Sequence, residues 1–288
     1  MVIQIKEQLV ALKFSLSIGQ KIVTKIEERF LIKFENLSTL DEQKQFLKNE
    51  AIYLYLKNFW QQYEFLIKKV EAEEDLKNFQ FYIPLTRILL ENYGELLYLV
   101  NQDEKTQLGI FIGKYLLYFS DMFRFVAIES TELKDEYDRF LKLMGGVLSS
   151  EDISFPSDIN SFSNGFLERN GFSFPRFEQI FNQPYFTIQS SKTLALWKKD
   201  SPSTFYNKYY RSHSNYTHPS FTNQMSGATN NEVFWIVQFM YIMAQLMVEL
   251  CNTKVFVGEF QSEYEKLVAE VKISYPILQS MWHTTPRA

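Results

Sequence analysis

Apolar residues recur at three- and four-residue steps along most of the chain. Ile22, Ile26 and Phe30 fall at four-residue steps, and a longer stripe comprises Ile52, Leu56, Phe59, Tyr63 and Leu66. Such spacing places the residues on one face of an α-helix. No region alternates strictly between apolar and polar residues over more than a few positions, as half-buried strands do. The sequence therefore predicts an all-α protein, built as a multi-helix bundle.

The first 75 residues are expected to form an N-terminal extension of two or three amphipathic helices. Lysines and glutamates fill the faces opposite the apolar stripes, which is typical of a solvent-exposed side. Thr39 and Glu42 have the spacing of a capping box at the start of the second, long helix. This extension is interpreted as half of a bundle or as an oligomerisation arm.

Residues 81–252 are expected to supply the core of a single domain that covers residues 1–288. Pro84 suits the first turn of a helix from Phe81 to Val100. The stretch Gly109–Glu129 is apolar almost all round, which is typical of a central helix. Further helices are predicted at Glu132–Met144, Thr193–Lys199, Ser203–Ser212, Glu232–Asn252 and Glu259–His283.

Glycine and proline change the character of the chain at Gly145. From there to about Ser190 the sequence is rich in Gly, Pro, Ser and Asn, which favour turns and loops. We interpret residues 145–190 as a loop-rich insertion with short helical pieces, which shapes access to a site in the bundle.

Composition excludes several classes of protein. The 288 residues are 46% hydrophobic and 22% charged, with 27 Phe and 17 Tyr, as in a folded protein whose core is rich in rings. A net charge of −4 argues against wholesale coating of nucleic acid but allows a local basic patch. The lone Cys251 excludes an intramolecular disulfide framework and suits a cytoplasmic protein. With three histidines, it also leaves little for a zinc or iron–sulfur site, so we predict neither metal nor cofactor.

One segment is long enough to span a membrane. Val233–Cys251 is apolar, but Gln238, Gln245 and Glu249 interrupt it, and no basic residue closely flanks its start. We therefore predict a helix buried inside the bundle rather than a membrane span. The N-terminal sequence likewise has the pattern of an amphipathic helix and not that of a signal peptide.

The candidate catalytic residues lie in a stretch without acidic residues. Ser201–Asn231 contains no Asp or Glu, and two of the three histidines lie in it behind an arginine. Arg211, Ser214 and His218 would share one helical face, with Pro219 favouring a helix end just before His218. Arginine offers phosphate a permanent forked charge, and histidine transfers protons near neutral pH. The pair suffices for metal-free RNA cleavage, with Ser214 orienting the phosphate.

The neighbourhood of this stretch favours a polyanionic ligand. Between Lys192 and His218, five basic residues stand against one acid, a local charge of +4. Aromatic rings that can stack on unpaired bases are interleaved with the charges. The candidate substrate-binding residues are Lys199, Lys208, Tyr210, Tyr216 and, on an upstream helix, Arg87.

A structural interpretation stands beside the catalytic one. Arg211 can pair with a carboxylate such as Glu91 across a helix interface, and His218 can bond a backbone carbonyl. Arg87 and Glu91 are four residues apart, which is also the spacing of a plain intrahelical ion pair. The aromatic residues can simply cover the bundle.

The segment Arg211–His218, RSHSNYTH, resembles the Arg-x4–6-His signature of the HEPN superfamily of small all-helical domains. Many members with this pattern are metal-independent endoribonucleases of toxin–antitoxin, abortive-infection and antiviral systems, and they usually act as dimers. The resemblance implies that Arg211 stabilises the scissile phosphate and that His218 is the general base or acid. His213 would assist or hold the second proton, and Ser214 would orient the phosphate.

A narrower resemblance is to uncharacterised bacterial helical proteins with an Arg-x3-Glu helix and a later Ser-x3-His-Pro segment. The matching residues are Arg87, Glu91, Ser214, His218 and Pro219. It covers about Phe81–Cys251 and implies that Glu91 fixes His218 or Arg211, with Arg87 holding Glu91. The expected function is that of a cytoplasmic homodimeric ribonuclease with RNA as substrate and an antitoxin or defence protein as partner. The alternative is a non-catalytic helical module that binds RNA, a nucleotide or a protein.

Overall fold

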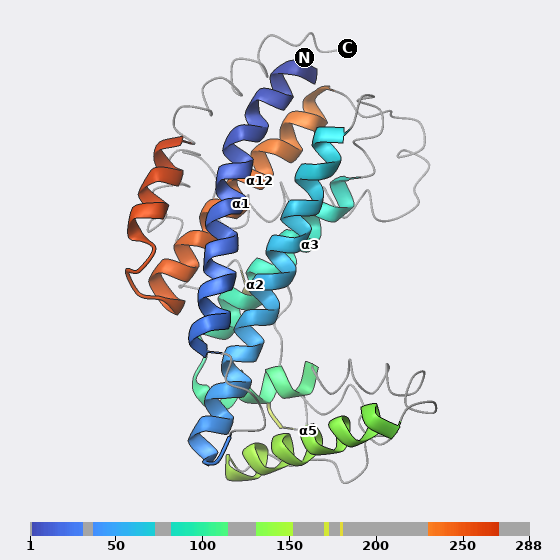
Figure 1. The fold of residues 1–288 in the computed structure, drawn as a ribbon, viewed down its shortest axis with the longest axis vertical. Helices are drawn as coiled ribbons and strands as arrows, with labels where there is room; N and C mark the ends of the chain where they lie inside the picture. Colours follow the sequence, from blue (N-terminus) through green and yellow to red (C-terminus); the bar gives the residue numbers. More distant parts are fainter. Residues whose placement is uncertain are drawn as a thin grey trace. The chain divides into compact units, whose positions relative to one another are not determined.

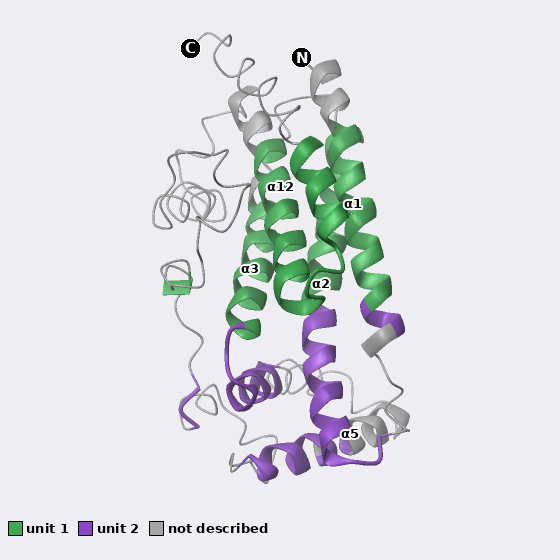
Figure 2. Cartoon of the chain, turned by 90° about the vertical axis from the view of Figure 1, so that its left-hand side faces the viewer, with its two compact units in different colours: residues 1–25, 55–100, 176–288 green, residues 26–54, 101–175 purple. Residues whose placement is uncertain are grey.

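The computed structural model describes residues 2–30, 37–72, 82–114, 131–151, 170–172, 179–180 and 230–270. These residues are helical almost throughout and contain no strand (Figure 1), so that the predicted all-α multi-helix fold is confirmed. The chain forms two compact units (Figure 2). Unit 1 comprises residues 1–25, 55–100 and 176–288, and unit 2 comprises residues 26–54 and 101–175.

The described part of unit 1 contains a bundle of four long helices. They are α1 (Val2–Phe30), the second half of α2 (Leu40–Ala72), α3 (Ile83–Val100) and α12 (Asn230–Leu250), and they lie side by side in both views (Figures 1 and 2). α1, α3 and α12 run in one direction and α2 runs in the other. Within the described residues, the predicted N-terminal helices are α1 and α2, and Pro84 lies in the first turn of α3 as expected.

The predicted apolar stripe of α2 forms part of the core of unit 1. Leu56, Phe59, Tyr63 and Leu66 are all completely buried. Gly19 of α1 lies against the indole of Trp60 on α2, since a Cβ at position 19 would fall inside the van der Waals radii of the ring carbons. A glycine is thus required for α1 to approach α2 closely at this level.

α12 is the most completely buried helix among those described. Every residue from Ile236 to Leu250 is buried except Gln238 and Glu249, which are partly exposed. Within the described residues, the stretch Ile236–Val255 is long and apolar enough to cross a membrane, and 83% of its most apolar window is buried inside the protein. The core helix of a soluble protein is also long, apolar and mostly buried. The burial of α12 therefore agrees with the prediction of a helix inside the bundle.

α12 ends in a turn of π-helix, Cys251–Val255, which reverses the chain. Asn252 holds the reversal together, because its Oδ1 accepts from Phe260 N at 2.9 Å and its Nδ2 donates to Gln261 Oε1 at 2.8 Å. Gly258 adopts a φ of 84°, which a residue with a Cβ rarely adopts. A helix at residues 261–270 follows, within the predicted Glu259–His283; residues 271–283 lie outside the described residues.

In unit 2, the first half of α2 begins with the predicted capping box. Thr39 N donates to Glu42 Oε2 at 2.8 Å, and Glu42 N donates to Thr39 Oγ1 at 3.2 Å. Ser38 adds bonds to the same carboxylate oxygen from its backbone N, at 2.9 Å, and its hydroxyl, at 2.8 Å. Three of these bonds satisfy backbone N–H groups at the start of the helix, which have no intrahelical partners, and the fourth joins two side chains.

α5 (Thr131–Ser150) continues past the position where the sequence predicts the start of a loop. Both glycines of the pair at positions 145 and 146 are helical. Met144, Val147 and Leu148 are completely buried, and their burial outweighs a cost of about 1 kcal/mol for each glycine in a helix. The predicted loop-rich insertion is therefore wrong for residues 145–150, and most of residues 151–190 lies outside the described residues.

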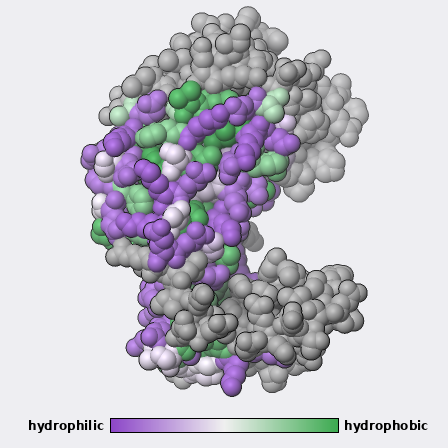
Figure 3. All heavy atoms as spheres, viewed as in Figure 1, coloured by the Kyte–Doolittle hydropathy of each residue, from purple (hydrophilic) through white to green (hydrophobic). Residues whose placement is uncertain are grey.

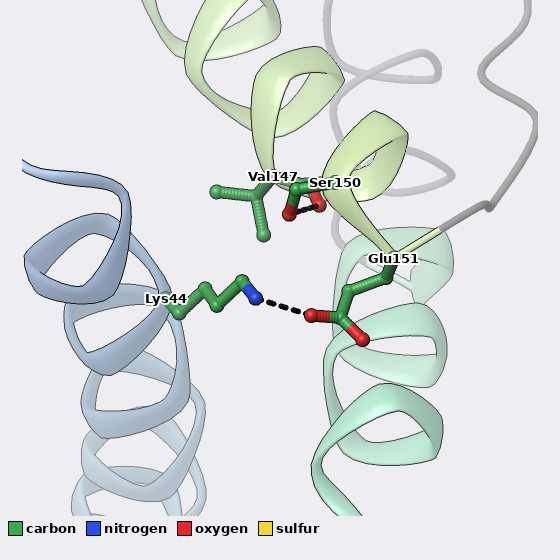
Figure 4. A network of polar contacts seen from close by, with 4 residues as sticks. All are labelled: Lys44, Val147, Ser150 and Glu151. Atoms are coloured by element: carbon green, nitrogen blue, oxygen red, sulfur yellow. Dashed lines mark hydrogen bonds and ion pairs between the residues drawn. The ribbon is translucent and has the colours of Figure 1, made fainter.

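An ion pair ties α2 to the end of α5 within unit 2. Lys44 Nζ meets Glu151 Oε1, and Ser150 Oγ donates to Val147 O at 2.7 Å to close the last turn of α5 (Figure 4). Both charged side chains are mostly buried, at 16% and 22% exposure.

Hydrophilic residues dominate the described surface on the face drawn in Figure 3, with apolar residues visible between them. Among the described residues, the exposed large apolar side chains are Val10, Phe14, Leu40, Phe65 and Val257. The first two lie on α1, the next two on α2 and the last in the turn after α12, and a few such residues are ordinary on protein surfaces.

Candidate functional site

Two of the ten predicted site residues, Arg87 and Glu91, belong to the described part of the chain. The other eight are Lys199, Lys208, Tyr210, Arg211, His213, Ser214, Tyr216 and His218. These eight lie outside the described residues, as do the predicted helices at Thr193–Lys199 and Ser203–Ser212 and residues 115–129 of the predicted central helix. Their proposed convergence remains a prediction.

Arg87 and Glu91 form the ion pair that their spacing predicts. Arg87 Nε donates to Glu91 Oε1 at 2.6 Å, and the side chains are 25% and 35% exposed. Both groups lie on α3 and both reach solvent in part. A charge-assisted bond of this length fixes the orientation of the carboxylate, so Glu91 is presented on α3 in a defined position.

The helix that carries this pair packs on the helix that follows the Arg211–His218 motif. α3 and α12 are in contact and run in the same direction, so their first turns point toward the same end of unit 1 (Figure 1). Arg87 lies in the second turn of α3, and α12 begins at Asn230, twelve residues after His218.

α2 also contributes a polar contact to α3. Tyr55 OH donates to Glu95 Oε2 at 2.7 Å, one turn of α3 beyond Glu91. Burial, together with the carboxylate of Glu95, raises the pKa of Tyr55 well above its usual range. The phenol therefore stays protonated and acts as a hydrogen-bond donor that orients Glu95, which is a structural role.

Metal chemistry has no candidate centre in the described ranges. Among these residues, no group of three or more His, Cys, Asp or Glu side chains is placed so as to hold a metal ion. Cys251 is completely buried, and burial raises the pKa of its thiol well above the ordinary range. Such a thiol is inert toward nucleophilic chemistry.

Sequence reasoning missed a set of polar groups inside the bundle. Tyr241, Gln245 and Glu249 follow one another at four-residue steps on α12, and Gln245 is completely buried. The signal was present, since two of these residues interrupt the apolar segment considered as a membrane span. Their four-residue spacing, which places all three on one face of the helix, was the available signal.

Comparison with known proteins returned no match: no protein-family model, no curated protein and no solved structure is similar to this chain. The class that the described fold defines is therefore an all-α multi-helix protein with a partly exposed Arg–Glu pair on α3.

Proposed function

We propose that the chain is a metal-independent endoribonuclease of a bacterial defence or toxin–antitoxin system. The observation that carries the proposal is the sequence Arg211-x6-His218 in a stretch without acids, within an all-helical chain. This combination resembles the HEPN ribonucleases, whose signature places one arginine and one histidine at such spacing.

The proposed reaction uses only side chains. His218 takes the proton from the ribose 2′-OH, and the oxygen attacks the adjacent phosphorus. Arg211 stabilises the negative charge of the phosphorane, and Ser214 orients the phosphate. The bond to the 5′-oxygen breaks as that oxygen receives a proton, which His213 supplies. The products are a 2′,3′-cyclic phosphate and a 5′-hydroxyl end.

The geometry of α3 supports a second part of the proposal. Glu91 is held by Arg87 at 2.6 Å and is 35% exposed, so its carboxylate is oriented and still accessible. We assign it the task of fixing His218 or Arg211. This assignment draws on the narrower resemblance, which joins an Arg-x3-Glu helix to a Ser-x3-His-Pro segment.

Binding of RNA is assigned to the basic and aromatic residues around the motif. The local charge of +4 attracts phosphates, and the rings of Tyr210 and Tyr216 stack on unpaired bases. Lys199, Lys208 and Arg87 complete the proposed binding surface. The protein is proposed to be cytoplasmic and to act as a homodimer that brings two motifs together, with an antitoxin or defence protein as its regulator.

Cleavage of RNA by the purified protein in EDTA tests the proposal. Wild type is compared with Arg211→Ala, His218→Ala and, as a matched control, His283→Ala, which removes the histidine outside the motif. We expect 2′,3′-cyclic phosphate ends from wild type and the control, and a loss of at least 100-fold in rate in both motif variants. A fully active His218→Ala protein would overturn the proposal.

A non-catalytic binding module is the alternative, and the interleaving of positive charges with aromatic rings favours it as much as it favours catalysis. A binding module would bind RNA, release it at high salt and leave the RNA intact. In that case Arg211→Ala would weaken binding, whereas His218→Ala would leave it nearly unchanged at pH 8, where an unperturbed histidine is neutral.

A further inference from the structure

The interior of unit 1 contains a stripe of polar side chains on an otherwise apolar helix. Tyr241, Gln245 and Glu249 are one helical turn apart from each other on α12, so they project from one face over about 12 Å. Tyr241 is 1% exposed and Gln245 is completely buried, and one oxygen of Glu249, Oε2, is also buried. The stripe is therefore enclosed by the protein for most of its length.

The other helices of the bundle direct polar groups toward the same interior. The phenol of Tyr63 on α2 lies near that of Tyr241 and beside the Ser15 hydroxyl of α1, and burial raises the pKa of Tyr63 well above its usual range. Tyr93 on α3 is near Glu249, and burial raises its pKa in the same direction. Each phenol therefore stays neutral and keeps a proton to donate.

Helix direction places further polar atoms at the level of Gln245. Because α2 runs opposite to α12 (Figure 1) and Tyr63 is near Tyr241, the next turn of α12 lies level with the preceding turn of α2. Gln245 is thus level with Trp60, whose ring contacts that of Tyr63 at 5.3 Å between centroids. The buried polar groups of the two helices therefore lie at two successive levels, Tyr63 with Tyr241 and Trp60 with Gln245.

Several of these buried polar atoms have no hydrogen-bond partner among the described residues. In the part of the chain that the structure describes, hydrogen bonds of ordinary geometry are missing at Gln245 Nε2 and Oε1, at Tyr63 OH and at Trp60 Nε1. The Ser15 hydroxyl beside Tyr63 donates to Ala11 O at 2.9 Å. A buried side-chain amide without a hydrogen-bond partner for its nitrogen or its oxygen is rare in folded proteins, and ordered water commonly serves as the partner of both atoms.

We propose that the core of unit 1 is a binding site for water, in which at least one long-lived molecule bonds to the buried amide of Gln245. The required ligand is small and neutral, accepts from the amide Nε2 and donates to Oε1. An ion would lose its hydration in this core, and an apolar molecule would leave the amide unsatisfied.

The test counts internal water molecules by oxygen-17 relaxation dispersion on the purified protein. Wild type is compared with Gln245→Leu and with Gln61→Leu, a matched change at an exposed glutamine of α2. We expect at least one water with a residence time above a microsecond in wild type and in Gln61→Leu, and at least one fewer in Gln245→Leu.

Equal counts in wild type and Gln245→Leu would overturn the proposal, as would a crystal structure in which Gln245 bonds directly to protein groups. If Gln245→Leu does not fold, Gln245→Met replaces it, because this change also removes the amide and keeps the length of the side chain. The site does not depend on the proposed ribonuclease function, and its test has no activity readout.

Discussion

Gly19 of α1 lies directly against the indole of Trp60 on α2, in a space that no side chain can share with the ring. We expect Gly19→Ala to lower the free energy of unfolding by about 1–3 kcal/mol, because the added methyl forces the helices apart or the indole out of its rotamer. Urea denaturation followed by circular dichroism measures the change.

The matched control for this substitution is Gly146→Ala. Gly146 is helical and exposed, and a Cβ there would meet no atom within 4 Å. The same methyl group should therefore stabilise α5, by about 0.5–1 kcal/mol, since alanine is the better helix former. Opposite signs at the two glycines are the expected result, and a stabilising Gly19→Ala would show that α1 and α2 do not approach closely there.

The capping box predicts an acid-sensitive start to α2. Backbone and side-chain bonds from Thr39 and Ser38 lower the pKa of Glu42 from 4.5 to about 2. A carboxyl whose pKa is lowered in the folded state contributes stability above its ordinary pKa and loses it as the pH falls toward the folded value. The stability advantage of wild type over Glu42→Gln should therefore be constant above pH 5 and disappear between about pH 4.5 and 2.

Carboxyl titration by NMR checks this assignment of cause. Ser38→Ala removes the hydroxyl that donates to Glu42 Oε2 at 2.8 Å, so it should raise the pKa of Glu42 part of the way toward 4.5. A pKa that stays the same in this variant would contradict the role of the Ser38 hydroxyl.

Local patterns of the sequence predicted those features whose partners lie within one or two helical turns. The capping box and the Arg87–Glu91 pair are of this kind, and both form. Each depends on a contact between neighbours on one helix, which spacing alone specifies. Pro84 in the first turn of α3 and the apolar stripe of α2 were also predicted, because the backbone preference of proline and the three- and four-residue spacing of apolar side chains are visible in the sequence.

Local sequence patterns did not predict the features that depend on tertiary burial. The sequence pattern predicts the end of α5 too early, because two glycines weaken a helix locally. The burial of Met144, Val147 and Leu148, which stabilises the helix beyond this point, depends on distant segments. The partners Lys44 and Glu151 are 107 residues apart, and no local pattern joins them. The proposed assembly of Arg211, His218 and Glu91 would need long-range contacts of the same kind, so the candidate site stays a prediction.

The Lys44–Glu151 pair is expected to stabilise unit 2 through coupling of its charges. The carboxylate of Glu151 raises the pKa of Lys44, so the stabilisation is present below the ordinary lysine pKa of 10.5 and is lost as the pH rises above it. Lys44→Met and Glu151→Gln should each lower the melting temperature at pH 7, and the double variant should be no less stable than the worse single variant. Strictly additive effects in this cycle would show that the two charges are not coupled.

Cys251 should report unfolding of the core around the end of α12. Its thiol is completely buried, and burial raises its pKa, so both access and the thiolate needed for reaction are restricted. We expect a thiol reagent to modify the native protein at least 100-fold more slowly than the protein in urea. Rapid labelling of the native protein would show that the turn Cys251–Val255 opens readily.

Glu91→Gln tests whether the pair on α3 serves the proposed reaction or only the helix. A partly exposed ion pair four residues apart contributes about 0.3–0.5 kcal/mol, so the variant should remain folded with an almost unchanged melting temperature. If Glu91 orients His218 or Arg211, the same variant should lose at least tenfold in the rate of RNA cleavage, with a changed pH profile. Glu64→Gln on α2 is the matched control, because Glu64 pairs with Lys68 at the same spacing and distance, 2.6 Å. Equal cleavage rates for wild type and both variants, at equal stability, would leave Glu91 with a structural role and remove it from the proposed site.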